Sequence, residues 1–112
     1  MNNMNNQPKS LSMQEKVYAF IEKYGLNVDP YIRYIDLTSE VGELGKELLK
    51  GSNYGKKEYI ITQETALELG DTLFPLICIA CGLGIDIEEA LDRVLKKYEN
   101  RFILKGDIGS GR

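Results

Sequence analysis

The sequence predicts an all-α protein in which four helices form a single bundle. Apolar residues recur at helical spacing between residues 11 and 104, and no stretch alternates between apolar and polar residues as a half-buried strand would. Cap residues and glycine stops divide this region into four segments with short links, which is typical of a helix bundle. A chain of 112 residues is long enough for one domain but not comfortably for two.

The first helix is expected from about residue 11 to residue 24. Ser12, with Glu15 three positions later, resembles a capping box, in which each side chain accepts a hydrogen bond from the other residue's backbone N–H. Gly25 then ends the helix, because glycine readily takes the left-handed conformation of a C-cap.

The second helix is expected over residues 31–50, with Asp29 as N-cap, Pro30 at the first helical position and Gly51 as the stop. On a helical wheel it carries two separate stripes. The apolar stripe consists of Leu37, Val41, Leu44 and Leu48. The acidic stripe consists of Asp36, Glu40, Glu43 and Glu47.

The third and fourth helices are expected over about 62–81 and 86–101, separated by Gly82 and Gly84. After Asp71 the third helix is apolar on every side, so it should be buried all round. Three other helices of a short chain can hardly achieve this. We therefore expect a homodimer that pairs this helix with its symmetry mate and so completes the bundle.

The two ends of the chain differ from the region between them. Residues 1–10 are polar and asparagine-rich, and residues 105–112 are glycine-rich, so we expect two flexible tails around a domain at 11–104. The N-terminus lacks the apolar segment of a signal peptide, and the longest apolar run, 73–83, is about half a membrane span. We expect a cytoplasmic protein that binds no membrane.

The residue types present exclude several kinds of chemistry. The chain has no histidine, so the commonest general base and transition-metal ligand are both absent. Its net charge of −3 gives no electrostatic reason to bind nucleic acid. Cys78 and Cys81 stand without further cysteine or histidine, so they cannot form a zinc site within one chain. We interpret them as small apolar residues of a helix core.

Two acidic motifs are the candidates for chemistry: Glu40-Val-Gly-Glu43 and Glu68-Leu-Gly-Asp71. In each, the two acids lie on one helix face, where like charges repel, and partly buried like charges persist when a cation compensates them. Antiparallel packing of the two helices would bring both pairs together as an all-oxygen site suited to Mg²⁺ or Mn²⁺. Such a site would bind a phosphate ester or anhydride. Alternatively, Glu40 and Glu43 belong to a solvated acidic face.

The segments TSEVGELGKELLK (38–50) and ALELGDTLFPLICIACGLGIDIEEALDRVLKKYENRF (66–102) resemble the MazG-type nucleoside triphosphate pyrophosphohydrolases. The signature of that family is E-x-x-E, a variable spacer and E-x-x-D. Here the spacer between Glu43 and Glu68 is 24 residues long, within the usual range of the family. The resemblance covers about residues 12–102.

This resemblance implies hydrolysis of a nucleoside or deoxynucleoside triphosphate to the monophosphate and pyrophosphate with Mg²⁺, at sites that two subunits of a dimer or tetramer build together. It implies four metal ligands and two phosphate-binding residues. The implied metal ligands are Glu40, Glu43, Glu68 and Asp71, and the phosphate-binding residues are Lys97 and Arg101. Because there is no histidine, we expect Glu43 to be the catalytic base. Nucleotide-pool house-cleaning is the expected role.

Some features depart from the family pattern or leave alternatives open. Leu95 stands where many members have asparagine, and Pro75, which should bend the third helix or remove a hydrogen bond, stands where a large or aliphatic residue is common. Further candidates are loop lysines for the phosphates and aromatic rings for the base. They are Lys56, Lys57, Tyr18, Phe20, Tyr31 and Tyr34. The alternatives are phosphoribosyl-ATP, dUTP or dCTP as substrate, or a non-catalytic, metal-binding dimerisation module.

Overall fold

The structure is a computed structural model that describes residues 11–106; within this range it contains four helices and no strand, which confirms the all-α prediction. The helices are α1 (Met13–Tyr24), α2 (Pro30–Gly51), α3 (Gln63–Leu83) and α4 (Ile87–Lys105). The tails expected at 1–10 and 107–112 lie outside the described residues.

The first two helices begin as the sequence predicts. The Oγ of Ser12 accepts a hydrogen bond from the Glu15 N–H (3.1 Å), and Glu15 Oε1 accepts one from the Ser12 N–H (2.8 Å). Gly25 ends α1 with φ of 61°. Asp29 Oδ1 caps α2 by accepting a hydrogen bond from the Tyr31 N–H (2.9 Å). These local signals suffice because a cap is formed by residues that are neighbours in sequence.

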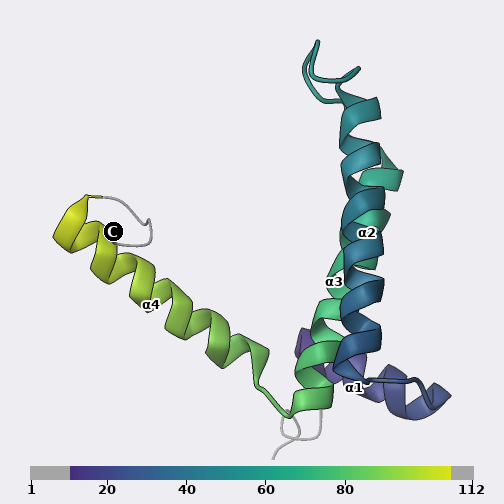
Figure 1. Cartoon of the computed structure of the whole chain (residues 1–112), viewed down its shortest axis with the longest axis vertical. Helices are drawn as coiled ribbons and strands as arrows, with labels where there is room; N and C mark the ends of the chain where they lie inside the picture. Colours follow the sequence, from purple (N-terminus) through teal and green to yellow (C-terminus); the bar gives the residue numbers. More distant parts are fainter. Residues whose placement is uncertain (1–10, 107–112) are drawn as a thin grey trace, which may run out of the picture.

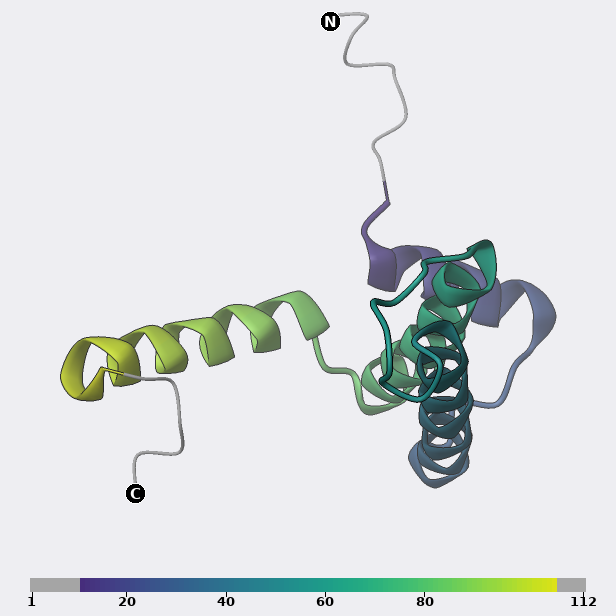
Figure 2. The same cartoon turned by 90° about the horizontal axis from the view of Figure 1, so that it is seen from above.

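The centre of the fold is an antiparallel hairpin of α2 and α3, joined at one end by the loop 52–62, with α1 crossing the other end beside α3 (Figures 1 and 2). The backbones approach closely where α3 ends. A Cβ at Gly82 would collide with the carbonyl oxygen of Val28, which precedes α2. Glycine at position 82 therefore permits the packing of α3 against the link between α1 and α2.

The fourth helix does not join the other three within one chain, so the chain does not close the predicted four-helix bundle by itself, and its completion by a second copy stays a prediction. Figure 1 shows α4 leaving the lower end of α3 and extending away from the hairpin. The radius of gyration is 18.3 Å, against about 13 Å for a compact chain of this length. The helix is also one turn longer than predicted, since it continues to Lys105 and ends at Gly106, with φ of 82°.

The apolar core of one chain is small. Within the described range its buried residues are Ile21, Pro75, Ile77, Cys78 and Ala80. The sequence predicts that the part of α3 after Asp71 is buried all round once a second chain pairs with it. Within one chain, Leu73 and Leu76 in this part are 40% and 42% exposed. Among residues 11–106, α3 is long and apolar enough to cross a membrane by length and composition alone. No other helix of the same chain covers the outer apolar face of α3 within the described residues.

Within α3, the predicted effect of Pro75 is limited to the hydrogen bond that proline cannot make. The helix continues through this residue from Gln63 to Leu83. Pro75 has no N–H, so it cannot donate to the carbonyl of Asp71. Both cysteines are free thiols, and burial raises the pKa of the Cys78 thiol, which fits a helix-core residue better than a reactive one.

Candidate metal centre

Three of the four carboxylates predicted to bind metal lie together on the hairpin. Glu40 comes from α2, and Glu68 and Asp71 come from α3. One carboxylate oxygen from each of the three lies within 4.8 Å of the other two. Glu40 and Glu68 are half-buried, and Asp71 is exposed. The antiparallel packing of the two helices thus joins motifs that are far apart in sequence.

The helices are in close contact at the level of these acids. Thr72 Oγ1 donates a hydrogen bond to the carbonyl of Glu68 in its own helix (2.8 Å), and it lies 3.4 Å from the carbonyl of Glu40 on α2. Because a threonine hydroxyl is short, the two backbones must lie close together here. The carboxylate cluster therefore rests on rigid helical backbone rather than on loops.

The carboxylates destabilise one another's charged forms. Partial burial, then the charges of Asp71 and Glu40, raise the pKa of Glu68 above its ordinary value of 4.5. Partial burial, then the charges of Asp71 and Asp36, raise the pKa of Glu40. Glu68 Oε1 is also buried without a hydrogen-bond partner among the described residues. A buried carboxylate oxygen with no donor is costly unless a cation satisfies it.

A divalent cation fits this cluster. All the donors are oxygens, which Mg²⁺ and Mn²⁺ prefer. Two oxygens on one Mg²⁺ lie at most about 4.2 Å apart. The observed spacing of up to 4.8 Å is only slightly wider than that limit. The orphaned Glu68 oxygen and the mutual repulsion of the acids are the observations that favour a metal over a solvated acidic face.

Glu43, the fourth predicted ligand and the predicted base, lies beside the cluster but not in it. Its side chain is 53% exposed, and its Oε1 lies 3.9 Å from Lys46 Nζ. Its charge nonetheless contributes to raising the pKa values of Glu40 and Glu68, after the effects of burial and of nearer acids. The structure thus places Glu43 next to the candidate metal site, with a side chain free to turn towards it.

The structure adds a half-buried cation that our sequence reasoning missed. The side chain of Arg33 is only 15% exposed, and its Nη1 lies 3.0 Å from Asp36 Oδ2. Its Nε donates to the carbonyl of Asn27 (2.7 Å), and its guanidinium lies over the ring of Phe74 on α3. Arg33 therefore holds Asp36, one turn before Glu40, and ties the start of α2 to α3. The R-x-x-D spacing was the available signal.

Lys97 and Arg101 are not brought to the carboxylates of their own chain. Both lie on α4, which diverges from the hairpin (Figures 1 and 2). They share one face of the helix, where the Lys97 Nζ and the Arg101 Cζ lie 5.6 and 6.0 Å from the ring centroid of Tyr98. Leu95, two positions before Lys97, is exposed. The phosphate-binding role of the two cations stays a prediction.

The aromatic residues predicted to stack on a base fall into two groups. Phe20 packs against Phe74 of α3, edge to face, with a centroid separation of 6.0 Å. A shallow apolar cavity of about 390 Å³ lies beside this pair. Tyr18, Tyr31 and Tyr34 are exposed. None of them is placed against the carboxylate cluster by a contact within the described residues, so the stacking role also stays a prediction.

Fold and site together define an all-α protein with a candidate divalent-metal centre on an antiparallel helix pair. The family model of the MazG nucleotide pyrophosphohydrolase domain matches residues 31–102, well over half of the chain. The match spans α2, α3 and most of α4, and it includes every predicted metal-binding, catalytic and phosphate-binding residue. The chain belongs to this family, which supports a nucleotide pyrophosphohydrolase activity.

Two comparisons agree with this assignment. The chain is 43% identical over 68 residues to the uncharacterized protein YpjD of Bacillus subtilis strain 168; the match covers 58% of this chain and about three-fifths (60%) of that protein. The crystal structure of YPJD from Bacillus subtilis, described there as a candidate pyrophosphatase, superimposes with a TM-score of 0.66 at 33% identity. That superposition covers 86% of this chain and 98% of the other.

Proposed function

We propose that this protein hydrolyses nucleoside or deoxynucleoside triphosphates to the monophosphate and pyrophosphate with Mg²⁺, or with Mn²⁺ in its place, and clears unwanted nucleotides from the pool. The observation that carries the proposal is the cluster of Glu40, Glu68 and Asp71, with a buried oxygen of Glu68 unpaired, on the helix pair that the family model matches. Such a cluster is suited to hold a cation that in turn binds phosphates.

In this proposal Glu40, Glu68 and Asp71 hold the metal, and Glu43 joins them by rotation of its side chain. A bound Mg²⁺ supplies charge neutralisation for the triphosphate and lowers the pKa of water. Glu43 is the residue that accepts the proton of the attacking water on a carboxylate oxygen. Its position one turn from Glu40, and its exposure, leave it free to do so.

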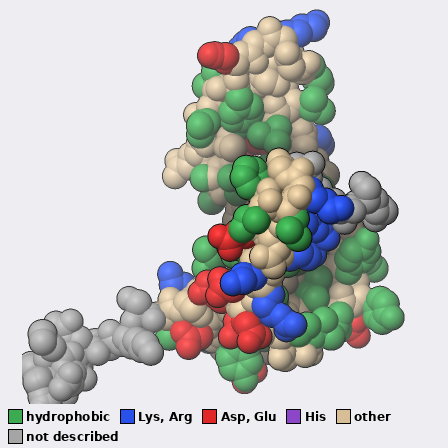
Figure 3. All heavy atoms as spheres, turned by 90° about the vertical axis from the view of Figure 1, so that its left-hand side faces the viewer, with side chains coloured by type: hydrophobic (Ala, Val, Ile, Leu, Met, Phe, Trp, Pro, Cys, Tyr) green, Lys and Arg blue, Asp and Glu red, His purple; other side chains and the backbone are tan. Residues whose placement is uncertain are grey.

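Lys97 and Arg101 would neutralise the phosphates from a second copy of the chain. Because α4 points away from the hairpin of its own chain, these cations are available to the carboxylates of another. The same pairing would cover the exposed leucines of α3. Figure 3 shows hydrophobic side chains at the surface in the upper half of the molecule, where the hairpin projects beyond α4. We therefore propose a homodimer or a tetramer built from dimers.

The pairing of α3 with its symmetry mate also accounts for the apolar character of this helix without a membrane. Glu68 and Asp71 lie within α3, and two carboxylates at that depth would be costly in a bilayer. We accordingly propose a cytoplasmic protein with no membrane partner. The net charge of −3 favours small phosphate ligands that arrive with Mg²⁺ over a nucleic-acid backbone.

The test is a product assay. Purified protein is incubated with Mg²⁺ and a panel of NTPs, dNTPs, dUTP, dCTP, oxidised nucleotides and phosphoribosyl-ATP, and the monophosphate and pyrophosphate are quantified. Glu43→Gln should reduce turnover by about 10²- to 10⁴-fold, because it removes the proton acceptor. The best substrate of the panel distinguishes a general pyrophosphohydrolase from a relative specific for dUTP, dCTP or phosphoribosyl-ATP.

No turnover on any nucleotide, with Glu43→Gln binding metal as well as the wild type, would leave the non-catalytic dimerisation module as the remaining interpretation. That module predicts that Glu68→Gln or Asp71→Asn stabilises the metal-free protein and has no functional consequence.

A further inference from the structure

The turn between α3 and α4 is fixed at its first residues by its own backbone. Gly84 takes a left-handed conformation (φ 68°) and donates its N–H to the carbonyl of Cys81 (3.2 Å). Ile85 donates to the carbonyl of Ala80 (2.9 Å), which completes a Schellman motif. These bonds stop α3. They do not determine where the following helix points, since Asp86 already belongs to the cap of α4.

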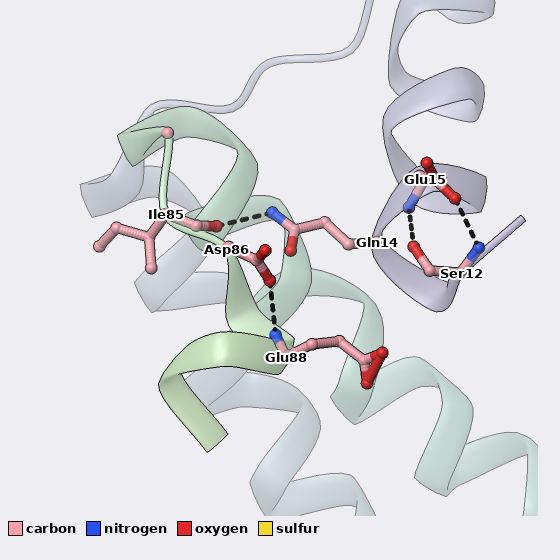
Figure 4. A pocket seen from close by; sticks show the side chains of 7 residues that line it. Ser12, Gln14, Glu15, Ile85, Asp86 and Glu88 are labelled. Atoms are coloured by element: carbon pink, nitrogen blue, oxygen red, sulfur yellow. Dashed lines mark hydrogen bonds between the residues drawn. The ribbon is translucent and has the colours of Figure 1, made fainter. Parts of the chain in front are cut away.

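A side chain from α1 forms hydrogen bonds to the backbone on both sides of Asp86 in this turn. Gln14 Nε2 donates to the carbonyl of Ile85 (2.7 Å), and Gln14 Oε1 accepts from the N–H of Ile87 (2.8 Å). Figure 4 shows the Gln14 amide reaching across from α1 to the backbone of Ile85. A primary amide presents a donor and an acceptor side by side, so one side chain satisfies the two backbone groups that flank Asp86.

The bond to Ile87 completes the capping of α4. Ile87 is the first residue of the helix, so its N–H has no acceptor within the helix itself. Asp86 Oδ1 accepts hydrogen bonds from the next two N–H groups, those of Glu88 (3.0 Å) and Glu89 (3.1 Å). Gln14 supplies the acceptor for the Ile87 N–H, which Asp86 does not. The start of α4 is thereby attached to α1 as well as to α3.

We infer that Gln14 is a positioning residue that sets the direction of α4 and so places Lys97 and Arg101 at the phosphate site; this inference rests on the proposed function. A helix rises about 1.5 Å per residue, so Lys97 lies about 15 Å along the axis from Ile87, and a 10° rotation at the turn moves it by about 2.6 Å. A displacement of that size breaks a hydrogen bond between a cation and a phosphate oxygen, because such bonds hold only over donor–acceptor distances of about 2.7–3.2 Å.

The experiment replaces Gln14 with methionine, which has a similar length and shape but neither donates nor strongly accepts hydrogen bonds. Gln63→Met is the matched control, because Gln63 is an exposed glutamine in the first turn of α3. A second variant, Ile87→Pro, removes the N–H from the other side of the contact. Proline is tolerated at the first position of a helix, and Asp86 before it has the extended backbone that proline requires.

We expect Gln14→Met to speed hydrogen exchange of the Ile87 amide about tenfold, because it loses its acceptor. We expect Gln14→Met and Ile87→Pro to raise the Kd of Mg²⁺-pyrophosphate and the KM of the nucleotide about fivefold or more, with kcat within about twofold. Binding of Mn²⁺ to the carboxylates should not change. Gln63→Met should match the wild type in each measurement.

The inference is overturned if both variants fold and bind Mg²⁺-pyrophosphate as the wild type does, whether or not exchange at Ile87 changes. It is also overturned if Mn²⁺ binding weakens in parallel with the phosphate affinity, because Gln14 would then support the whole fold and not the direction of α4. Wild-type protein that neither turns over a nucleotide nor binds pyrophosphate contradicts the proposed function itself, and removes the phosphate site on which this inference rests.

Discussion

Glu40 on α2 and Glu68 on α3 hold carboxylate oxygens within 4.8 Å of each other, and an oxygen of Asp71 lies within that distance of both. In a metal-free chain this arrangement opposes folding, because burial and like charges both disfavour the ionised groups. A bound divalent cation reverses the sign of the interaction. The two states therefore differ in stability, in pH dependence and in their response to substitution.

Glu68→Gln should raise the melting temperature of the metal-free protein, because it removes a charge whose buried oxygen has no partner. It should also abolish the stabilisation by Mg²⁺, which in the wild type amounts to about 2.7 kcal/mol at a metal concentration one hundred times Kd. Thermal melts with chelator and with Mg²⁺ measure both effects. Glu22→Gln, at an exposed site on α1, is the control that should show neither. Equal stabilisation by Mg²⁺ in Glu68→Gln and the wild type would place the metal elsewhere.

The raised pKa values predict how the stability of the metal-free protein depends on pH. Burial, then neighbouring acids, raise the pKa values of Glu40 and Glu68 above 4.5 in the folded chain, so these groups bind more protons when folded than when unfolded. Their contribution therefore decreases as pH rises from 4.5 through the raised values, and it is constant above them. The excess melting temperature of Glu68→Gln over the wild type should grow over that interval. An excess that stays constant would mean that Glu68 titrates normally.

The affinity for Mg²⁺ should depend on the ionisation of the same two carboxyl groups, but it should increase with pH where the stability of the metal-free protein decreases. The metal binds the ionised carboxylates, so its affinity should rise as pH rises through the raised pKa values of Glu40 and Glu68. Calorimetric titration of the wild type at a series of pH values, in buffers of different ionisation enthalpy, would show proton release on binding. Affinity that is independent of pH across this interval would contradict a site made of these two acids.

Mixing two impaired variants, assayed at a nucleotide concentration well below KM, tests whether two chains build each site. Glu43→Gln removes the proposed base, and Arg101→Ala should weaken binding by about tenfold or more through loss of a charge-assisted bond. If Arg101 serves the partner's carboxylates, each mixed dimer contains one intact site, and an equal mixture should recover about a quarter of wild-type activity. Lys96→Ala, a neighbouring exposed lysine, is the control and should remain active. No recovery would mean that Glu43 and Arg101 act within one chain.

The approach of α3 to the link before α2 predicts the effect of a substitution away from the site. Gly82→Ala should destabilise the protein by about 1–3 kcal/mol, because a Cβ there collides with the backbone carbonyl of Val28 and the backbone must shift. Gly45→Ala, in α2 with open space around it, should instead stabilise by about 0.5–1 kcal/mol. Chemical denaturation of both variants measures the difference. Similar stability for the two variants would show that the backbone at the end of α3 shifts to accommodate the Cβ at little cost.

The sequence was most informative where structure depends on neighbouring residues. The capping box of Ser12 and Glu15 and the cap of Asp29 could be read directly, since the partners of each cap lie within a few positions. The pairing of Glu40 with Glu68 and Asp71 could also be predicted, because two helices joined by a short loop pack antiparallel. The departure of α4 could not. It depends on how α1 holds the turn after α3, through the hydrogen bonds of Gln14, and on what the fourth helix has available to pack against.

The contacts that the sequence did not reveal are those between distant residues. Gln14 bonds to Ile85 and Ile87, 71 and 73 positions away, and no local pattern marks a glutamine for that role. Arg33 was readable only as half of a helical ion pair with Asp36, whereas its contacts with Asn27 and Phe74 depend on the packing of α2 against α3. The position of Glu43 outside the cluster likewise reflects a side-chain rotation that no spacing encodes.

The most direct test of the metal centre is a crystal structure of the wild type grown with Mn²⁺, with the ion located by its anomalous scattering, beside crystals of Glu68→Gln grown in the same way. The proposal predicts an anomalous peak coordinated by Glu40, Glu68 and Asp71 in the wild type and no peak there in the variant. Two results would contradict it. One is a wild-type protein that turns over nucleotide in solution but whose crystals show no ion between these three residues. The other is an equal anomalous peak in Glu68→Gln.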